Sequence, residues 1–244
     1  MRYLINISYD GTNYSGYQKQ NNKITIQETI ENVLSQIFKQ EITIVASGRT
    51  DAGVSAIEQV CHMDINVEFE GKKVLGYANS LLPADIRINV IKKVESEFHA
   101  RYSAKRKTYE YYFYVGQHQI PVYDKFASRV GYVLDIENMK KACEEIKGEH
   151  DFSCFCASNT SIKDKTRTVY EIDIKNVDGC LYKLEITGNG FLYNMVRIIM
   201  GTLIDVGVGK ININDIKNII NGKDRSKAGK TANSKGLYLK KVDY

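Results

Sequence analysis

Hydrophobic and polar positions along the first half of the chain predict six regular elements. Residues 2–9 alternate as a half-buried strand does, and residues 26–38 carry apolar side chains at helical spacing. Thr25 followed by Glu28 fits a capping box at the start of that helix. The remaining elements are strands at 41–46, 58–67 and 86–94 and a helix at 72–82. The predicted order is β-α-β-β-α-β.

The second half repeats this order. Residues 108–115 read as a strand rich in Tyr and Phe, and residues 136–147 as a helix followed by Gly148. Asp178-Gly179 marks a turn between two strands. The remaining elements are strands at 168–176, 180–187 and 237–242, a mostly apolar helix at 190–206 and a short helix at 214–221. The order is again β-α-β-β-α-β, with one helix added.

Each half therefore predicts a split-βαβ unit, the ferredoxin-like arrangement also found in RNA-recognition modules. We expect an α+β protein with an N-terminal domain at 1–103 and a C-terminal domain at 104–244. The two sheets, covered by helices, are expected to flank a central cleft. Because this topology serves many unrelated functions, it does not decide the function of the chain.

Composition narrows the class of protein. Of the 244 residues, 43% are hydrophobic, and no run approaches the ~20 apolar residues of a membrane span. The N-terminus lacks the apolar segment and cleavage site of a signal peptide, so a cytoplasmic protein is expected. The five cysteines read as reduced thiols, and the four histidines do not cluster with them at zinc-ligand spacing.

Basic residues gather in two runs, although the net charge is only +5. Three successive cations occupy 105–107, just before a predicted strand, and four lie within 223–230. Clustered cations suit the phosphates of a nucleic acid and give a salt-dependent affinity. A solvated loop is the alternative for either run taken alone.

The most informative chemistry lies in the segment Gly48-Arg49-Thr50-Asp51-Ala52-Gly53-Val54. An arginine and a carboxylate without an apolar role stand between two glycines, which let the backbone turn sharply or approach a ligand closely. The alternative is a tight turn in which Asp51 caps the backbone.

This segment closely resembles the active-site motif of the tRNA pseudouridine synthase A (TruA) family. The resemblance covers nearly the whole chain, because further segments match that family's motifs in order. They are Tyr9-Asp10-Gly11-Thr12 with Tyr14, Gly16, Tyr17 and Gln18, then 98–104, 107–111, 190–197 and 236–239. Several matches in the same order and at suitable spacing are specific for the family, although no single match would be.

The resemblance implies roles for four residues. Asp51 falls on the family's catalytic aspartate, and Arg197 on the basic residue that pairs with it. Tyr109 falls on the tyrosine that stacks against the target base, and Arg49 on an arginine linked to RNA binding and base flipping. From the residues alone, Tyr109 could instead belong to cross-strand packing, and Arg197 to an ordinary structural ion pair.

Two positions depart from the family's pattern. Ser55 stands where histidine is common, which removes an imidazole from the local RNA contacts. Tyr17 stands where tryptophan is common and keeps an aromatic face.

The family's reaction isomerises uridine to pseudouridine, and the resemblance implies positions 38, 39 and 40 of the tRNA anticodon arm, a homodimer and a pseudouridine synthase fold with mostly antiparallel sheets. The bond between ribose and uracil nitrogen breaks, the base rotates, and a bond to carbon replaces it. Nothing is oxidised and no group arrives, so we expect neither a cofactor nor a metal. A carboxylate can serve as covalent nucleophile or as base at the sugar, and both stay open.

Base extrusion costs a few kcal/mol, and stacking on an aromatic ring returns ~1–3 kcal/mol. Because Asp51 lies in the first half and Tyr109 and Arg197 in the second, we expect the site in the cleft between the halves. A non-catalytic RNA-binding paralogue on the same scaffold is the alternative, and an unrelated cytosolic enzyme with an aspartate nucleophile is a third possibility.

Overall fold

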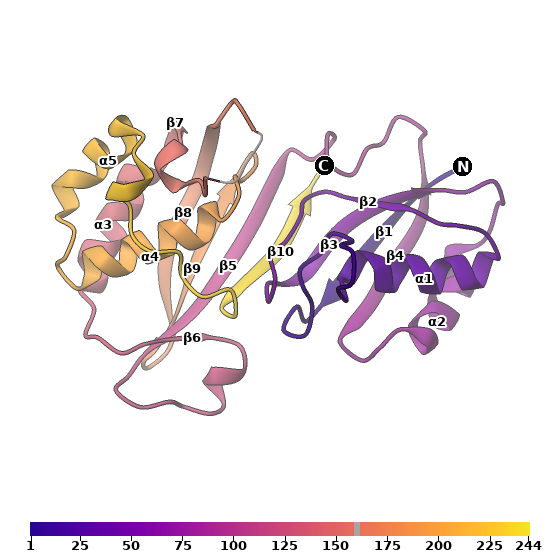
Figure 1. Ribbon diagram of the computed structural model, residues 1–244, viewed down its shortest axis with the longest axis horizontal. Helices are drawn as coiled ribbons and strands as arrows, with labels where there is room; N and C mark the ends of the chain where they lie inside the picture. The colour runs from indigo at the N-terminus through magenta and orange to yellow at the C-terminus, as the bar shows by residue number, and fades with distance from the viewer. Residues whose placement is uncertain (159–161) are drawn as a thin grey trace. The chain divides into compact units, whose positions relative to one another are not determined.

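The chain divides into two compact units in the computed structural model, which describes residues 1–158 and 162–244. Unit 1 combines Met1–Lys105 with Tyr238–Tyr244, and unit 2 covers Arg106–Leu237 (Figure 1). The domain division at 103/104 stays a prediction. Within the described residues, no helix has both the length and the apolar character needed to cross a membrane.

Unit 1 follows the predicted β-α-β-β-α-β order. Its elements are β1 (Arg2–Tyr9), α1 (Ile26–Phe38), β2 (Ile44–Ala46), β3 (Ser55–Asp64), α2 (Gly71–Leu81) and β4 (Ile86–Val94), joined by the last strand of the chain, β10 (Leu237–Asp243). The strand order is β4-β1-β3-β10, and β2 pairs with β3. All of these pairings are antiparallel except that of β10 with β3.

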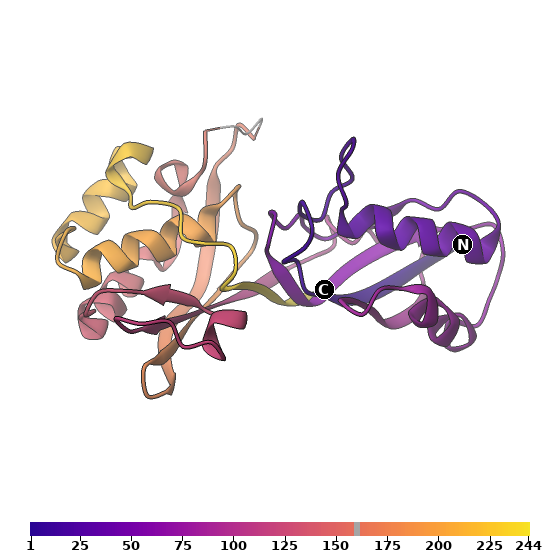
Figure 2. The same cartoon turned by 60° about the horizontal axis from the view of Figure 1, so that its bottom comes forward.

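The core of unit 1 follows from the alternation seen in the sequence. Ile5 and Ile7 of β1 and Ile30 and Leu34 of α1 have no exposed surface. The predicted cap of α1 is confirmed, since the Thr25 hydroxyl accepts a hydrogen bond from the backbone N–H of Glu28 over 3.4 Å. Figure 2 shows α1 running along the strands of this unit.

Unit 2 combines a further set of strands with α-helices and short 3-10 helices. Its elements are β5 (Arg106–Val115), η1 (Tyr123–Lys125), β6 (Ser128–Val130), α3 (Ile136–Ile146), β7 (Gly148–Asp151), η2 (Ser153–Phe155), β8 (Thr166–Asp178), β9 (Leu181–Gly188), α4 (Met195–Gly207), η3 (Ile213–Asp215), α5 (Ile216–Gly222) and η4 (Arg225–Lys227). The strand order is β5-β9-β8-β7, with β6 parallel to β5. Figure 1 shows α3, α4 and α5 gathered beside β8 and β9.

Three differences from the sequence prediction bear on the site. Strand β3 begins at Ser55 instead of residue 58, so it starts directly after the Asp51 segment. Strand β10 pairs with β3, although its place in the chain suggested the second half. Helix α4 begins at Met195 instead of residue 190, because Asn194 adopts a left-handed conformation that a helix cannot contain.

Candidate active site

The Asp51 side chain is half-buried in the loop that joins β2 to β3. The backbone turns sharply there: Val54 N–H donates to the Asp51 carbonyl over 3.1 Å, and Gly53 has a φ of 75°. Only a residue without a Cβ adopts that φ at little cost, so the second glycine of the motif is explained by the turn. The turn itself was the alternative interpretation of this segment, and it coexists with a partly accessible carboxylate.

A buried glutamine holds the start of this loop. Gln59 of β3 has no exposed surface; its Oε1 accepts from the Ser47 hydroxyl over 2.7 Å, and its Nε2 donates to the Gly48 carbonyl over 2.9 Å. A buried polar side chain costs stability unless its hydrogen bonds are made, so Gln59 pins the loop in one position. Gln59 was not among the residues predicted from the sequence. Its signal was an amide directly before the apolar pair Val60-Cys61 of the strand.

The residue before Asp51 is fastened to the opening segment of the chain. The Tyr9 and Thr50 hydroxyls are 2.8 Å apart, and Tyr17 N–H donates to the Thr50 carbonyl over 3.0 Å. Gly16, with φ 94°, packs so closely that a Cβ would lie 3.0 Å from that same carbonyl oxygen. The loop is therefore rigid before any substrate arrives, which is the condition for a pre-organised catalytic carboxylate.

Arg49 lies in the same loop as Asp51, two residues before it, and its side chain is exposed. Its assignment to RNA binding stays a prediction. Ser55, at the position where the family commonly has histidine, is buried, and its Oγ accepts from Gly11 N–H over 3.1 Å. Ser55 therefore has a role in packing the opening segment of the chain against the start of β3.

Tyr109 lies on β5 of unit 2, opposite Ile186 of β9, and only 8% of it is exposed. Its ring meets Phe191 edge to face, with centroids 5.1 Å apart and planes at 82°. Tyr111 and Phe113 follow at alternate positions of the strand and are fully buried. The ring contact of Tyr109 is thus with Phe191, which lies outside the strands. Packing among Tyr109, Tyr111 and Phe113 and the stacking role both stay predictions.

Arg197 projects from the first turn of α4 and is half-buried. Its Nε donates to the Ala232 carbonyl over 2.8 Å, and its Nη1 donates to Asn194 Oδ1 over 2.8 Å. In return, Ala232 N–H donates to the Arg197 carbonyl over 3.0 Å. Both oxygens thus accept hydrogen bonds from the guanidinium.

Tyr111 of β5 contacts the residue that follows Ala232. Its hydroxyl donates to the Asn233 carbonyl over 2.9 Å and lies 3.0 Å from Ser128 Oγ, whose own hydroxyl can donate to it. Burial raises the pKa of the Tyr111 phenol to about 12, while the Ser128 bond and the nearby Arg197 charge lower it. The hydroxyl therefore stays protonated at neutral pH and remains a donor.

The structure thus groups Arg197 with Asn194, Ala232 and Tyr111 in unit 2, and Asp51 with Thr50 and Gln59 in unit 1. The predicted meeting of Asp51 with Tyr109 and Arg197 stays a prediction. Within the described residues, no group of three or more His, Cys, Asp or Glu side chains is arranged to hold a metal ion.

Two cations of the second basic run make contacts within the fold. Lys223 forms an ion pair with Asp151 at 2.9 Å, and Arg225 donates to the carbonyls of Ala228 and Gly229. Lys227 and Lys230 are exposed. The run therefore mixes loop-fixing contacts with solvated charge.

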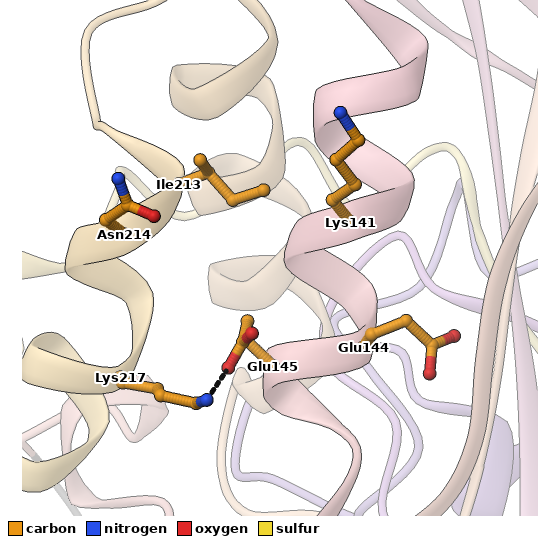
Figure 3. Close-up of a pocket in the computed structure, with 6 residues that line it drawn as sticks. All are labelled: Lys141, Glu144, Glu145, Ile213, Asn214 and Lys217. Carbon is orange, nitrogen blue, oxygen red and sulfur yellow. Dashed lines mark ion pairs between the residues drawn. The ribbon is translucent and has the colours of Figure 1, made fainter.

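The hollow in Figure 3 lies between α3 and the η3–α5 segment and does not contain any predicted site residue. It is lined by Lys141, Glu144, Glu145, Ile213, Asn214 and Lys217. The Lys217–Glu145 ion pair, 2.9 Å long, spans it.

Comparison with known proteins connects both units to one family. The family model described as tRNA pseudouridine synthase matches residues 5–103 and 142–244. The tRNA pseudouridine synthase A of Thermoanaerobacter sp. (strain X514) is 45% identical over 242 residues, covering 99% of this chain and 98% of that protein. The tRNA pseudouridine synthase A of Bacillus subtilis (strain 168) is 42% identical over 247 residues, covering 100% and 99%.

Among solved structures, the archaeal box H/ACA sRNP Nop10-Cbf5 complex matches 93% of this chain and 59% of its own, with a TM-score of 0.39 and 15% identity. A likeness of that size adds nothing to the family assignment, which depends on the sequence relatives.

Proposed function

The chain belongs to the tRNA pseudouridine synthase A family, and we propose that it isomerises uridine to pseudouridine in the anticodon stem-loop of tRNA, at positions 38, 39 and 40. It is an isomerase with the α+β fold of pseudouridine synthases. The sequence alternative of a non-catalytic paralogue loses support, because the relatives that match the full length are named as enzymes.

The observation that carries the proposal is the set of hydrogen bonds that holds the Asp51 loop. A carboxylate that is half-buried and set on a loop tied to Gln59, Tyr9 and Tyr17 can be presented to a sugar without reorganisation. Asp51 acts there as nucleophile at the anomeric carbon or as base at the sugar.

The atoms balance without a cofactor. The bond from ribose C1′ to uracil N1 breaks, a bond from C1′ to C5 forms, the C5 hydrogen leaves to water, and N1 gains a proton. Since the product is an isomer of the substrate, no external oxidant, reductant or group donor is required.

Three other side chains complete the proposal. Tyr109 offers a ring on which the extruded uracil can stack, an interaction worth ~1–3 kcal/mol. Arg197 is the basic residue that the family resemblance pairs with the catalytic aspartate, and Arg49 contacts the RNA near the displaced base. The exposed Lys105 and Arg106 supply phosphate contacts that weaken with salt.

Release of tritium from tRNA labelled at uracil C5 tests the proposal. The wild-type protein should release tritium into water, and Asp51→Asn should release it at least about 10³-fold more slowly while still binding tRNA. The matched control is Asp173→Asn, the same change at an exposed aspartate of β8, which should behave as wild type. Equal release by the wild type and Asp51→Asn would remove Asp51 from the mechanism.

Two finer parts of the proposal need their own measurements. Mapping pseudouridines in the product tRNA should find them at positions 38, 39 and 40, and modification elsewhere would contradict the proposed specificity. We also propose a homodimer, as the resemblance implies. Sedimentation equilibrium should then give twice the chain mass of 27.7 kDa.

A further inference from the structure

The segment between β1 and α1 contains a loop, residues 18–24, in which every residue is exposed. In Figure 2 the chain just before α1 projects from unit 1 as a narrow loop. Its sequence, Gln-Lys-Gln-Asn-Asn-Lys-Ile, contains two cations, four amides and no acidic residue. The flanking residues differ, since Tyr17 and Ile26 are buried. The loop therefore presents amides and positive charge to solvent, and the core begins on either side of it.

Hydrogen bonds hold the two ends of this loop against each other. Ser15 N–H donates to the Ile24 carbonyl over 2.9 Å, and Ile26 N–H donates to the Gly16 carbonyl over 3.2 Å. Within the loop, Gln20 Nε2 donates back to the Ser15 carbonyl over 2.8 Å. The base of the loop is thus fixed by backbone and side-chain contacts, which limit where the loop can project.

The base of the 18–24 loop lies on the backbone of the Asp51 loop. Tyr17 N–H donates to the Thr50 carbonyl over 3.0 Å, and a Cβ on Gly16 would lie 3.3 Å from the Asp51 carbonyl carbon. An extended chain advances at most ~3.6 Å per residue, so the tip, four residues beyond this contact, lies within about 14 Å of it. The side chains of the loop are therefore within range of the phosphates that flank a nucleotide whose sugar is at Asp51.

Three side chains of the loop are uncommitted. Among residues 1–158 and 162–244, Lys23 forms no ion pair, and Asn21 and Asn22 form no side-chain hydrogen bond. Lys19, by contrast, lies 3.8 Å from Glu28 Oε1. An ammonium group binds phosphate oxygens as a point charge, and an amide can donate to a phosphate or exchange hydrogen bonds with a ribose hydroxyl. The uncommitted groups therefore have the chemistry that an RNA backbone requires.

We infer that the 18–24 loop binds the RNA strand beside the reacting uridine, with Lys23 on a flanking phosphate and the amides of Asn21 and Asn22 on the same strand. The inference rests on the proposed function, because it takes the reacting uridine to be at Asp51. Contacts of this kind read the sugar-phosphate backbone and not the base sequence. Such contacts fit an enzyme proposed to act at three successive positions, each of which has different neighbouring bases.

Equilibrium binding of unmodified tRNA between about 50 and 200 mM salt tests the phosphate contact. Lys23→Gln should reduce the slope of log Kd against log salt by about 0.7–0.9, the value for one phosphate, and weaken binding about twofold to fivefold at the lowest salt. The matched control is Lys39→Gln, the same change at an exposed lysine directly after α1, about 20 Å along that helix from the loop. An unchanged slope in Lys23→Gln, or an equal change in Lys39→Gln, would overturn the inference.

An added negative charge probes the same loop in the opposite sense. Asn21→Asp keeps the size of the side chain and places a carboxylate beside the strand, so the affinity for tRNA should fall by about threefold at the lowest salt and by less at the highest, because exposed charges are screened. The control is Asn66→Asp, the same change at an exposed asparagine after β3, which should bind as wild type does. A loss of dimer mass in Asn21→Asp with unchanged tRNA affinity would overturn the inference and assign the loop to a contact between subunits.

A tethered cleavage probe locates the loop on the tRNA without requiring activity. An iron–EDTA group attached at Asn21→Cys should cut the tRNA within about three nucleotides of positions 38–40. Wild-type protein treated with the same reagent controls for the native cysteines, of which Cys180 is partly exposed. Cleavage confined to other parts of the tRNA would overturn the inference. Cleavage beside positions 38–40 by a protein whose wild type releases no tritium would instead sink the proposed function and leave the contact of the loop standing.

Discussion

Ser55 and Gly11 are joined by a buried hydrogen bond, in which Gly11 N–H donates to Ser55 Oγ over 3.1 Å. Gly11 packs against Val54 so tightly that a Cβ would overlap the Val54 carbonyl oxygen. The opening segment of the chain and the first residues of β3 therefore meet directly after Asp51. Serine at this position, where the family commonly has histidine, has a structural reason in this chain.

Ser55→Ala should lower the free energy of unfolding by about 1–2 kcal/mol, because the buried Gly11 N–H loses its acceptor. Urea unfolding at pH 7 measures this. The control is Ser80→Ala in α2, where the serine is exposed and alanine is the better helix former. A loss of less than about 0.5 kcal/mol in Ser55→Ala would mean that water replaces the serine.

Two helical glycines should respond to alanine in opposite directions. A Cβ added at Gly76 of α2 would have nothing within 4 Å, so Gly76→Ala should stabilise the protein by about 0.5–1 kcal/mol. A methyl group at Gly201 of α4 would overlap the Lys230 carbonyl oxygen, so Gly201→Ala should destabilise by more than about 2 kcal/mol. If the urea midpoints of Gly76→Ala and Gly201→Ala shifted equally, the close contact between Gly201 and the Lys230 carbonyl would be contradicted.

The Glu110–Lys183 ion pair should stabilise unit 2 strongly. Glu110 is 2% exposed, its Oε1 lies 2.6 Å from Lys183 Nζ, and its Oε2 accepts from the Tyr112 hydroxyl over 3.0 Å. Lys183→Met leaves a buried carboxylate without this cation and should cost about 3 kcal/mol in urea unfolding at pH 7. The double variant Glu110→Gln with Lys183→Met should recover part of that loss. A single variant as stable as wild type would show that solvent reaches Glu110.

Protonation of His62 should make the protein less stable in mild acid. Burial, together with the charges of Arg2 and His99, lowers the pKa of His62 to about 4. The unfolded chain, with an ordinary histidine pKa near 6.5, binds more protons between about pH 6.5 and 4, so stability falls as the pH falls through that window.

His62→Asn, which retains an acceptor for Ala100 N–H, should remove about 1 kcal/mol of the difference between urea unfolding at pH 7 and at pH 5. His118→Asn, at an exposed histidine, is the control and should leave the difference unchanged. An identical pH dependence in wild type and His62→Asn would assign the acid sensitivity to other groups.

Local patterns in the sequence were sufficient for most elements of the fold. Strands at 2–9 and 86–94 and the helix at 26–38 have the predicted bounds, because each carries its own period of apolar residues and, for the helix, its own cap. The motif around Asp51 was equally local: glycine, arginine and aspartate at fixed spacing already indicated a turn with chemistry in it. Family membership followed from such short segments in order.

The remaining features depend on residues distant in the chain. The pairing of β10 with β3, the hold of Gln59 on the Asp51 loop, and the close approach of Lys230 to Gly201 have no periodic signal, since nothing in one segment reports the other. Asn194, by contrast, has a local explanation, since it is the third residue of a turn in which Met195 N–H donates to the Leu192 carbonyl, and asparagine tolerates the left-handed backbone there. Residue types along the chain thus define which groups are available, whereas the packing of separate segments defines where each group points, because hydrogen bonds and close contacts depend on distance in space and not on distance in sequence.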